Sequence, residues 1–306
     1  MPCPLCAAIQ SRPSWFGATI FDDKQFVYRE CLSCRSLFCD PMPDERALEK
    51  MYGVHYAKSF VHDTLTGDPR QTERVLALLA AQSPGVFLDY GCGEGKLLAE
   101  VKAAGWSALG LELNPEVAEA TGRRVGVEVV SQLGAIAPRS VDVLHLGDVL
   151  EHLTMLSTQF PALLQLLKSG GTLISQGPLE AHANLFLLAL RLGRTLKRSP
   201  PASMPPYHVL LATADGQRRF FARFGLAEID FAMREVSWPA PEKLRLSDLR
   251  HARSVALYAL RKLSQALSAL LPRQLGNRYF FVGKATESAR PTTPRRSSRS
   301  TRAQAN

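Results

Sequence analysis

Apolar runs of strand length recur along the chain, and segments with helical spacing separate them. Residues 86–88 predict a buried strand, and a helix follows from about residue 96. Residues 106–113 predict a second strand, and residues 116–124 a helix that Asn114 caps and Pro115 opens. Further strands are expected at 141–144, 172–176, 226–231 and 278–283, and a helix at 215–224. Strands that alternate with helices are typical of an α/β fold.

The first 85 residues have a different pattern. Aromatic and apolar residues between positions 15 and 28 alternate enough to form short strands. Prolines at 41 and 43 break the chain, Asp44 can cap a helix that reaches about Met51, and another helix is expected near 70–82. We therefore expect a small module at 1–40, a helical linker and lid at 41–85, and the main domain at 86–285.

Three glycines at alternate positions follow the first predicted strand of the main domain. Gly91, Gly93 and Gly95 let the backbone approach a ligand, because no Cβ blocks it and positive φ angles are accessible. Such a turn alone is a weak signal, since tight turns and close helix packing also require glycine. Glu112 ends the second strand, about 20 positions later, where an acidic residue can accept ribose hydroxyls. The alternative for Glu112 is a solvated strand end. Together the two features predict a nucleoside site.

The order of the motifs carries a family resemblance. Asp89-x-Gly91-x-Gly93-x-Gly95, then Glu112, then residues 141–153, then residues 166–174 resemble the motifs of class I S-adenosylmethionine-dependent methyltransferases over roughly residues 70–285. The resemblance implies a Rossmann-like, doubly wound sheet of seven strands. NAD-binding proteins usually show Gly-x-Gly-x-x-Gly instead. The methyl donor S-adenosylmethionine therefore fits this turn better than NAD.

The resemblance assigns donor binding to residues of this chain. The glycines would shape a loop around the methionine moiety, Asp89 would hold that loop or the donor's amino group, and Glu112 would bind the ribose. The adenine should lie near residues 131–133, where many relatives have an aspartate that this chain lacks. The full donor-binding set that we expect is Asp89, Gly91, Cys92, Gly93, Gly95, Glu112, Leu113 and Asp148.

Methyl transfer to a hydroxyl or an acidic carbon also requires removal of a proton, and histidine is the natural base. His152 follows the fourth strand, and His208 follows a long insertion after the fifth, where relatives build the substrate wall. We expect both as catalytic candidates. In the alternative reading, His208 only bonds the backbone, and the Glu151-His152 pair only orders the donor loop. Tyr52, Tyr56 and Tyr207 are further candidates for acceptor contacts or for core packing.

Two Cys-x-x-Cys pairs lie in the N-terminal module. Cys3 and Cys6 are separated from Cys31 and Cys34 by 24 residues, a spacing suited to a tetrahedral zinc site. Four sulfur ligands leave no open position, so the predicted zinc ribbon is structural. The alternatives are reduced free cysteines or disulfides in a secreted chain. No export signal is recognisable, so disulfides are disfavoured and we expect a cytoplasmic protein.

The whole layout resembles a bacterial group of zinc-ribbon methyltransferases that act on deoxysugars, polyketide-type intermediates and other small metabolites. This resemblance implies O- or C-methylation of a sugar, a lipid-linked compound or a secondary metabolite. Two other classes stay open, namely an RNA base methyltransferase with a zinc module and a non-catalytic protein that has kept the fold.

Net charge and composition narrow these classes. The chain has 306 residues and a formal charge of +9, of which five arginines and one glutamate at 286–306 supply +4. This tail is expected to be disordered. The body is near neutral, which disfavours nucleic acid as a partner.

Segments 184–198 and 249–271 combine leucines with Arg and Lys, so they are either interfacial helices in peripheral membrane contact or lid and core helices.

Overall fold

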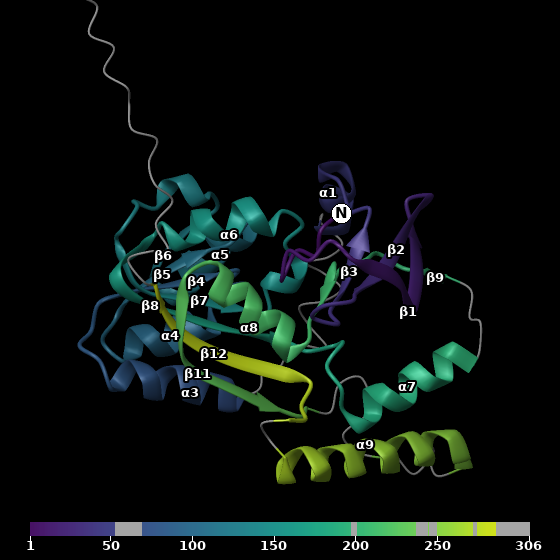
Figure 1. Cartoon of the computed structure of the whole chain (residues 1–306). Coiled ribbons are helices and arrows are strands. Elements are labelled where there is room, and N and C mark those ends of the chain that lie inside the picture. Colours follow the sequence, from purple (N-terminus) through teal and green to yellow (C-terminus); the bar gives the residue numbers. More distant parts are fainter. Residues whose placement is uncertain (53–68, 197–200, 237–243, 245–249, 272–273, 286–306) are drawn as a thin grey trace, which may run out of the picture.

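The computed structural model describes residues 1–52, 69–196, 201–236, 244, 250–271 and 274–285 (Figure 1). Within these residues, one sheet has the strand order β11-β12-β8-β7-β4-β5-β6 and the other has the order β10-β3-β2-β1-β9. The first contains β4 (Val86–Tyr90), β5 (Ser107–Leu111), β6 (Glu128–Val130), β7 (Val141–Gly147), β8 (Leu167–Pro178), β11 (Leu226–Arg234) and β12 (Arg278–Ala285). The second contains β1 (Ser11–Phe21), β2 (Lys24–Cys31), β3 (Leu37–Asp40), β9 (Ala202–Ser203) and β10 (Leu210–Leu211).

Helices cover the larger sheet and extend from it (Figure 1). They are α1 (Glu45–Tyr52), α3 (Pro69–Ala80), α4 (Lys96–Ala103), α5 (Pro115–Val125), α6 (Leu156–Leu164), α7 (Leu185–Leu196), α8 (Ala214–Arg223) and α9 (Ala252–Leu270). Two short 3-10 helices are η1 (Leu133–Ala135) and η2 (Leu150–His152). Tyr56 and the tail at 286–306 lie outside the described residues.

The larger sheet confirms the predicted seven-stranded, doubly wound architecture. Strands β4 to β8 run parallel, and β12 runs antiparallel to both β8 and β11. β4 lies between β5 and β7, because the chain builds β5 and β6 on one side of it and then crosses to β7 on the other. Ligands of such sheets bind at the carboxyl ends of the strands where the order reverses. In this chain, that edge lies after β4, β5 and β7.

Capping explains where α5 begins and ends. Asn114 Oδ1 accepts hydrogen bonds from the backbone amides of Glu116 and Val117, and Pro115 occupies the first turn. Gly126 ends the helix in the left-handed conformation. The predicted helix at 116–124 is confirmed within one residue at each end. Its start fixes the position of the strand end that carries Glu112.

The N-terminal sheet takes strands from the main domain. β3 pairs with β2 on one side and with β10 on the other, and β9 pairs with β1. β9 and β10 both belong to the segment that follows β8. Residues of both parts, such as Phe38 and Phe220, lie in one buried cluster. The N-terminal module is therefore structurally continuous with the main domain.

Helices α7 and α9 pack against each other away from the larger sheet (Figure 1). The side of α9 that is buried is polar, with Arg261, Ser264 and Ser268 fully covered. Leucines of both helices, by contrast, are exposed. Among the described residues, we find no helix with both the length and the apolar content that crossing a bilayer requires.

Candidate active site

The glycine turn after β4 has a backbone that only glycine adopts easily. Gly91, Gly93 and Gly95 have φ angles of 74°, 48° and 68°. A Cβ on Gly91 would lie 3.2 Å from Val149 Cγ2, and one on Gly95 would lie 2.7 Å from Thr121 Cγ2. The loop is also tied to β5, because the Gly91 amide donates to the Leu111 carbonyl at 2.7 Å. The turn therefore holds a fixed backbone surface at the sheet edge.

Glu112 lies against this turn, as predicted. Its Oε2 accepts a hydrogen bond from the Gly93 amide at 3.1 Å, and its Oε1 accepts one from the Asn114 amide at 3.1 Å. Each carboxylate oxygen has a further lone pair. Leu113 follows Glu112 with 64% of its surface exposed.

Burial raises the pKa of Cys92 to about 12, so its thiol is neutral and lies in the core. A donor contact at Cys92 would come from its backbone.

Asp89 has a partner that the sequence analysis missed. His145 Nδ1 donates to Asp89 Oδ1 at 2.7 Å, and both side chains are buried. The strand register places these two residues opposite each other on β4 and β7. A histidine inside the apolar run of β7 was the available signal. Among the described residues, His145 Nε2 has no hydrogen-bond partner.

Asp148 lies at the same edge of the sheet and pairs with Arg278. The Arg278 Nη2 atom donates to both carboxylate oxygens of Asp148, at 2.5 and 2.7 Å. Arg278 is the first residue of β12, which runs antiparallel to β8, so it reaches the carboxyl edge of the parallel strands. Arg278 reaches this edge because β12 runs antiparallel to β8. The strand direction is set by the sheet, so the sequence around Arg278 does not predict the pair with Asp148.

The two candidate catalytic histidines lie together. The rings of His152 and His208 are perpendicular, with centroids 4.9 Å apart. His152 Nδ1 lies 2.8 Å from the Tyr207 carbonyl and 2.9 Å from the Tyr52 hydroxyl. His208 Nδ1 donates to Glu180 Oε2 at 2.6 Å. The structure thus brings together both predicted histidines and two of the three predicted tyrosines, and it adds Glu180.

The electrostatic surroundings make the two histidines different. Burial alone would lower the pKa of His208, but the carboxylates of Glu180 and Glu151 outweigh it and raise that pKa to about 9. Burial and the neighbouring His208 lower the pKa of His152 to about 4. Burial, and then Asp148, raises the pKa of Glu151 to about 8. At neutral pH one imidazole is charged and the other is neutral.

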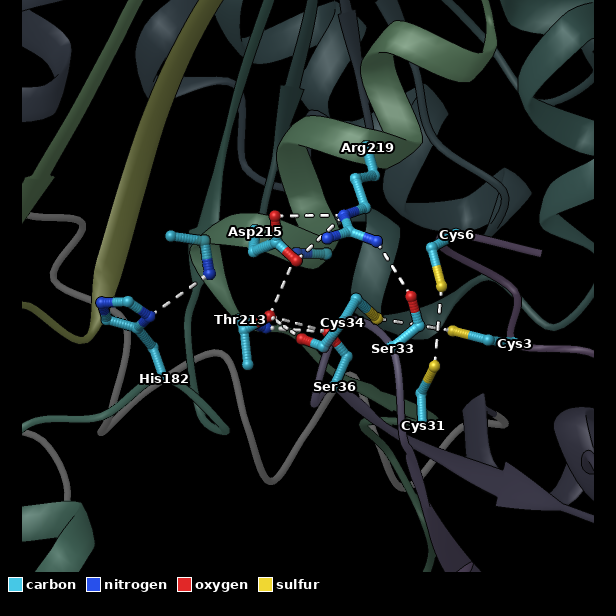
Figure 2. A network of polar contacts seen from close by, with 12 residues as sticks. Cys3, Cys6, Cys31, Ser33, Cys34, Ser36, His182, Thr213, Asp215 and Arg219 are labelled. Atoms are coloured by element: carbon cyan, nitrogen blue, oxygen red, sulfur yellow. Dashed lines mark hydrogen bonds and ion pairs between the residues drawn. The ribbon is translucent and has the colours of Figure 1, made fainter. Parts of the chain in front are cut away.

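The four N-terminal cysteines form one cluster (Figure 2). The Sγ atoms of Cys3 and Cys34 are 3.7 Å apart, and those of Cys6 and Cys31 are 3.5 Å apart. A tetrahedral zinc with four bonds of about 2.3 Å requires sulfur separations of about 3.8 Å. A disulfide requires about 2.05 Å, and all four cysteines are free. The cluster is compatible with a zinc ribbon.

Hydrogen bonds join the loop at residues 31–34 to the start of α8 (Figure 2). The Thr213 hydroxyl donates to the Cys34 carbonyl at 2.6 Å and accepts from the Gly216 amide at 3.0 Å, so it also caps α8. Arg219, one turn further along α8, donates to the Ser33 hydroxyl at 2.9 Å. The cysteine cluster and the main domain therefore share a hydrogen-bond network.

A second set of contacts joins the N-terminal sheet to His208. The Tyr28 hydroxyl on β2 donates to the His208 carbonyl at 2.7 Å. The amide of Cys39 on β3 donates to the Val209 carbonyl at 2.9 Å. The backbone that carries His208 is thus held by the N-terminal sheet, and the position of this ring depends on it.

Comparisons with known proteins agree with this architecture. Residues 66–229 match a family described as methyltransferase domain. A search of curated proteins finds no match.

Two solved structures illustrate the similarity. One is 1,6-didemethyltoxoflavin-N1-methyltransferase from Burkholderia thailandensis, with 13% identity, 89% of this chain and 100% of that chain covered, and a TM-score of 0.51. Another is magnesium protoporphyrin IX methyltransferase from Synechocystis PCC 6803, with 13% identity, coverage of 79% and 94%, and a TM-score of 0.47.

The family match spans more than half of the chain and includes the glycine turn, Glu112, His152 and His208. The seven-stranded, mostly parallel sheet flanked by helices matches the class I methyltransferase fold. The chain belongs to the methyltransferase domain family and is a class I S-adenosylmethionine-dependent methyltransferase.

Proposed function

We propose that this enzyme methylates a small-molecule acceptor that binds beside His152 and His208. The observation that carries the proposal is the contact of Glu112 with the Gly93 amide, which places a carboxylate over the donor loop. The two histidines lie at the same carboxyl edge of the sheet. The Burkholderia enzyme of the same fold was solved with bound 1,6-didemethyltoxoflavin and S-adenosylhomocysteine.

The donor site uses the residues of the first two strand ends. We assign the ribose hydroxyls to the free lone pairs of Glu112, and the donor's amino group to the carboxylate of Asp89, which His145 orients. Leu113, exposed beside Glu112, would cover one side of the nucleoside. The backbone of the glycine turn and Asp148 complete the proposed set. When bound, S-adenosylmethionine supplies an electrophilic methyl group on its sulfonium sulfur.

The acceptor's proton is assigned to the histidine pair. A neutral His152 whose Nδ1 donates to the Tyr207 carbonyl presents an unprotonated Nε2, which can accept a proton from a hydroxyl or an acidic carbon. The charged His208, held by Glu180, would stabilise negative charge that develops on the acceptor. This division of roles suits the O- or C-methylation of a sugar or a secondary metabolite.

Donor affinity tests the proposal. Replacing Glu112 with Ala removes the ribose acceptor, so binding of S-adenosylmethionine should weaken by about 1.5–3 kcal/mol, the usual contribution of a hydrogen bond to a charged group. Isothermal titration calorimetry with the donor and with S-adenosylhomocysteine measures this loss. Glu119→Ala is the control, because that carboxylate is exposed and pairs with Arg123 on the surface of α5. Equal affinities for wild type and Glu112→Ala would refute the ribose assignment.

We also propose a structural zinc ion bound by Cys3, Cys6, Cys31 and Cys34. The sulfur separations fit a tetrahedral ion, and four thiolates leave no position for substrate. The ion would fix the loop at residues 31–34, and through Thr213 the start of α8. Its role is therefore to hold the fold around the acceptor site rather than to take part in the chemistry.

We propose that α7 and α9 lie on an anionic lipid surface, as a lipid-linked acceptor would require. Leu188 and Leu192 on one side of α7 are 49% and 60% exposed, and Leu263 on α9 is also exposed. Arg253 lies on α9 and supplies positive charge, whereas Arg191 on α7 pairs with Glu30.

Co-sedimentation with vesicles that contain phosphatidylglycerol tests this surface. The double variant Leu188→Glu, Leu192→Glu should reduce the bound fraction at least fivefold. Ile229→Glu, on β11, is the control, because it places the same charge at another exposed apolar position. A wild-type protein that does not sediment with the vesicles would refute the contact.

A further inference from the structure

Glu151, His152 and His208 form a cluster with the composition of a metal site. One ligand atom from each lies within 4.8 Å of the others. Glu151 and His152 belong to η2, after β7, and His208 precedes β10. The Val209 amide donates to the Glu151 carbonyl at 2.8 Å and fixes these two segments together. Two imidazoles and one carboxylate are a common ligand set for divalent ions of the first transition series.

The hydrogen bonds of both histidines leave one ring nitrogen of each for a ligand. His152 Nδ1 donates to the Tyr207 carbonyl and His208 Nδ1 donates to Glu180. Each Nε2 is then the remaining ligand atom, and binding of a cation would release the second proton of His208. Histidines that bind metals almost always donate their other N–H to a carbonyl or a carboxylate, which sets the tautomer and the ring orientation. In this structure the Tyr207 carbonyl accepts the N–H of His152, and the carboxylate of Glu180 accepts the N–H of His208.

The carboxylate of Glu151 provides an independent observation. Glu151 is 6% exposed, and its Oε1 atom has no hydrogen-bond partner among the described residues. A buried carboxyl group with an oxygen that has no partner is unfavourable, and proteins normally satisfy such a group with a hydrogen bond or a cation. The unsatisfied group belongs to the same cluster as the two histidines, so a cation there would satisfy it.

We propose that Glu151, His152 and His208 bind one divalent cation, and that an oxygen atom of the acceptor completes its coordination. Three protein ligands leave positions open, as in catalytic rather than structural metal sites. The site adjoins the donor loop, because a Cβ on Gly91 would contact Val149, two residues before Glu151. The inference rests on the proposed function. With the cation bound, the cation would activate the acceptor, and the histidines would bind the cation instead of accepting the acceptor's proton.

The reaction balances with the acceptor hydroxyl and the donor alone. The cation makes the hydroxyl more acidic, and its proton passes to water. A lone pair of the oxygen forms the new bond to the methyl carbon, and the carbon–sulfur bond breaks. Its electron pair stays on sulfur, which becomes the neutral thioether of S-adenosylhomocysteine. The cation is unchanged, so no oxidant or reductant is needed.

Titration with Mn²⁺ tests the site without any acceptor. The electron paramagnetic resonance signal of the free ion measures how much Mn²⁺ is bound. Mn²⁺ prefers oxygen and nitrogen ligands, so it discriminates against the thiolates of the cysteine cluster. We expect wild type to bind one equivalent, and Glu151→Gln and His208→Asn each to bind at least tenfold more weakly. His251→Asn is the control, since this exposed histidine precedes α9 and belongs to neither ligand cluster of the described residues.

Electron spin-echo modulation from ¹⁴N on bound Mn²⁺ gives a second readout that needs only wild type. Modulation from directly bound imidazole is expected, and its absence would overturn the inference even if a variant failed to fold. Affinity for S-adenosylhomocysteine is measured on the same samples. If wild type binds S-adenosylhomocysteine but binds Mn²⁺ no more tightly than Glu151→Gln does, the cation site is refuted. The proposed function is then still supported. A protein that binds no nucleoside would contradict the proposed function itself.

Discussion

Serine at both Cys31 and Cys34 will abolish zinc binding at the cysteine cluster, unfold the N-terminal sheet and abolish methyl transfer. Zinc bound to four thiolates contributes about 10–16 kcal/mol in small zinc modules, and whole domains are stable by only about 5–15 kcal/mol. The module of about 40 residues is below the size at which a core alone suffices. Loss of two ligands therefore removes more free energy than the sheet can replace.

The effect will extend to the acceptor site through named contacts. Without the loop at residues 31–34, Thr213 loses the Cys34 carbonyl that it contacts at 2.6 Å. Without β2 and β3, the backbone at His208 loses its bond from Tyr28. The loss of activity should therefore exceed the loss of donor affinity, because Glu112 and the glycine turn lie on the larger sheet.

Metal analysis, circular dichroism and donor titration on the purified double variant measure these effects. Cys39→Ser is the matched control, since this buried cysteine lies outside the four-cysteine cluster and should leave the zinc content unchanged. A double variant with the same zinc content per chain as wild type would refute the ligand assignment. A variant that loses zinc but melts like wild type would refute the structural role.

Glutamine at Glu235 should lower the free energy of unfolding by about 3–5 kcal/mol, the usual effect of removing one partner of a buried ion pair. Glu235 follows β11 and pairs with Arg261 of α9, with side chains 2% and 1% exposed. Glu235 also accepts a hydrogen bond from Asn184 at 3.0 Å, just before α7. The carboxylate thus joins α7, α9 and the sheet, and its loss removes the negative charge that Glu235 places against the buried guanidinium of Arg261.

Urea denaturation gives the size of this effect, and hydrogen exchange gives its location. We expect amide protection to fall in α9 first. The double variant Glu235→Gln, Arg261→Met should recover most of the lost stability, because it removes both buried charges and keeps the long side chain over the Phe186 ring. If Glu235→Gln unfolds at the wild-type urea concentration, the ion pair does not stabilise the helix pair.

The sequence predicts those parts of the fold and site that depend on local signals. The cap at Asn114 and Pro115 defines α5 because both residues act within one turn. The glycine turn and Glu112 are visible because their spacing alone suggests a nucleoside site, and they do lie in contact. A doubly wound sheet of seven strands follows from the motif resemblance, and the strand pairing confirms it.

The parts that were missed depend on pairing over long separations. β9 and β10 have two residues each, too few to show alternation, and only the folded chain brings them to β1 and β3. His145 looks like any residue of a buried strand until the register places it beside Asp89. The leucines of α9 suggest an apolar inner face, but the buried carboxylate of Glu235 requires Arg261 and the serines there.

The hydrogen bond between Cys34 and Thr213 joins residues 179 positions apart. At a synthesis rate of about 5–20 residues per second, the second residue leaves the ribosome roughly 10–35 s after the first. During that interval the nascent N-terminus has an open strand edge and thiols that can oxidise or bind other metals. Early capture of zinc during translation would protect this end of the chain until its distant partner strand arrives.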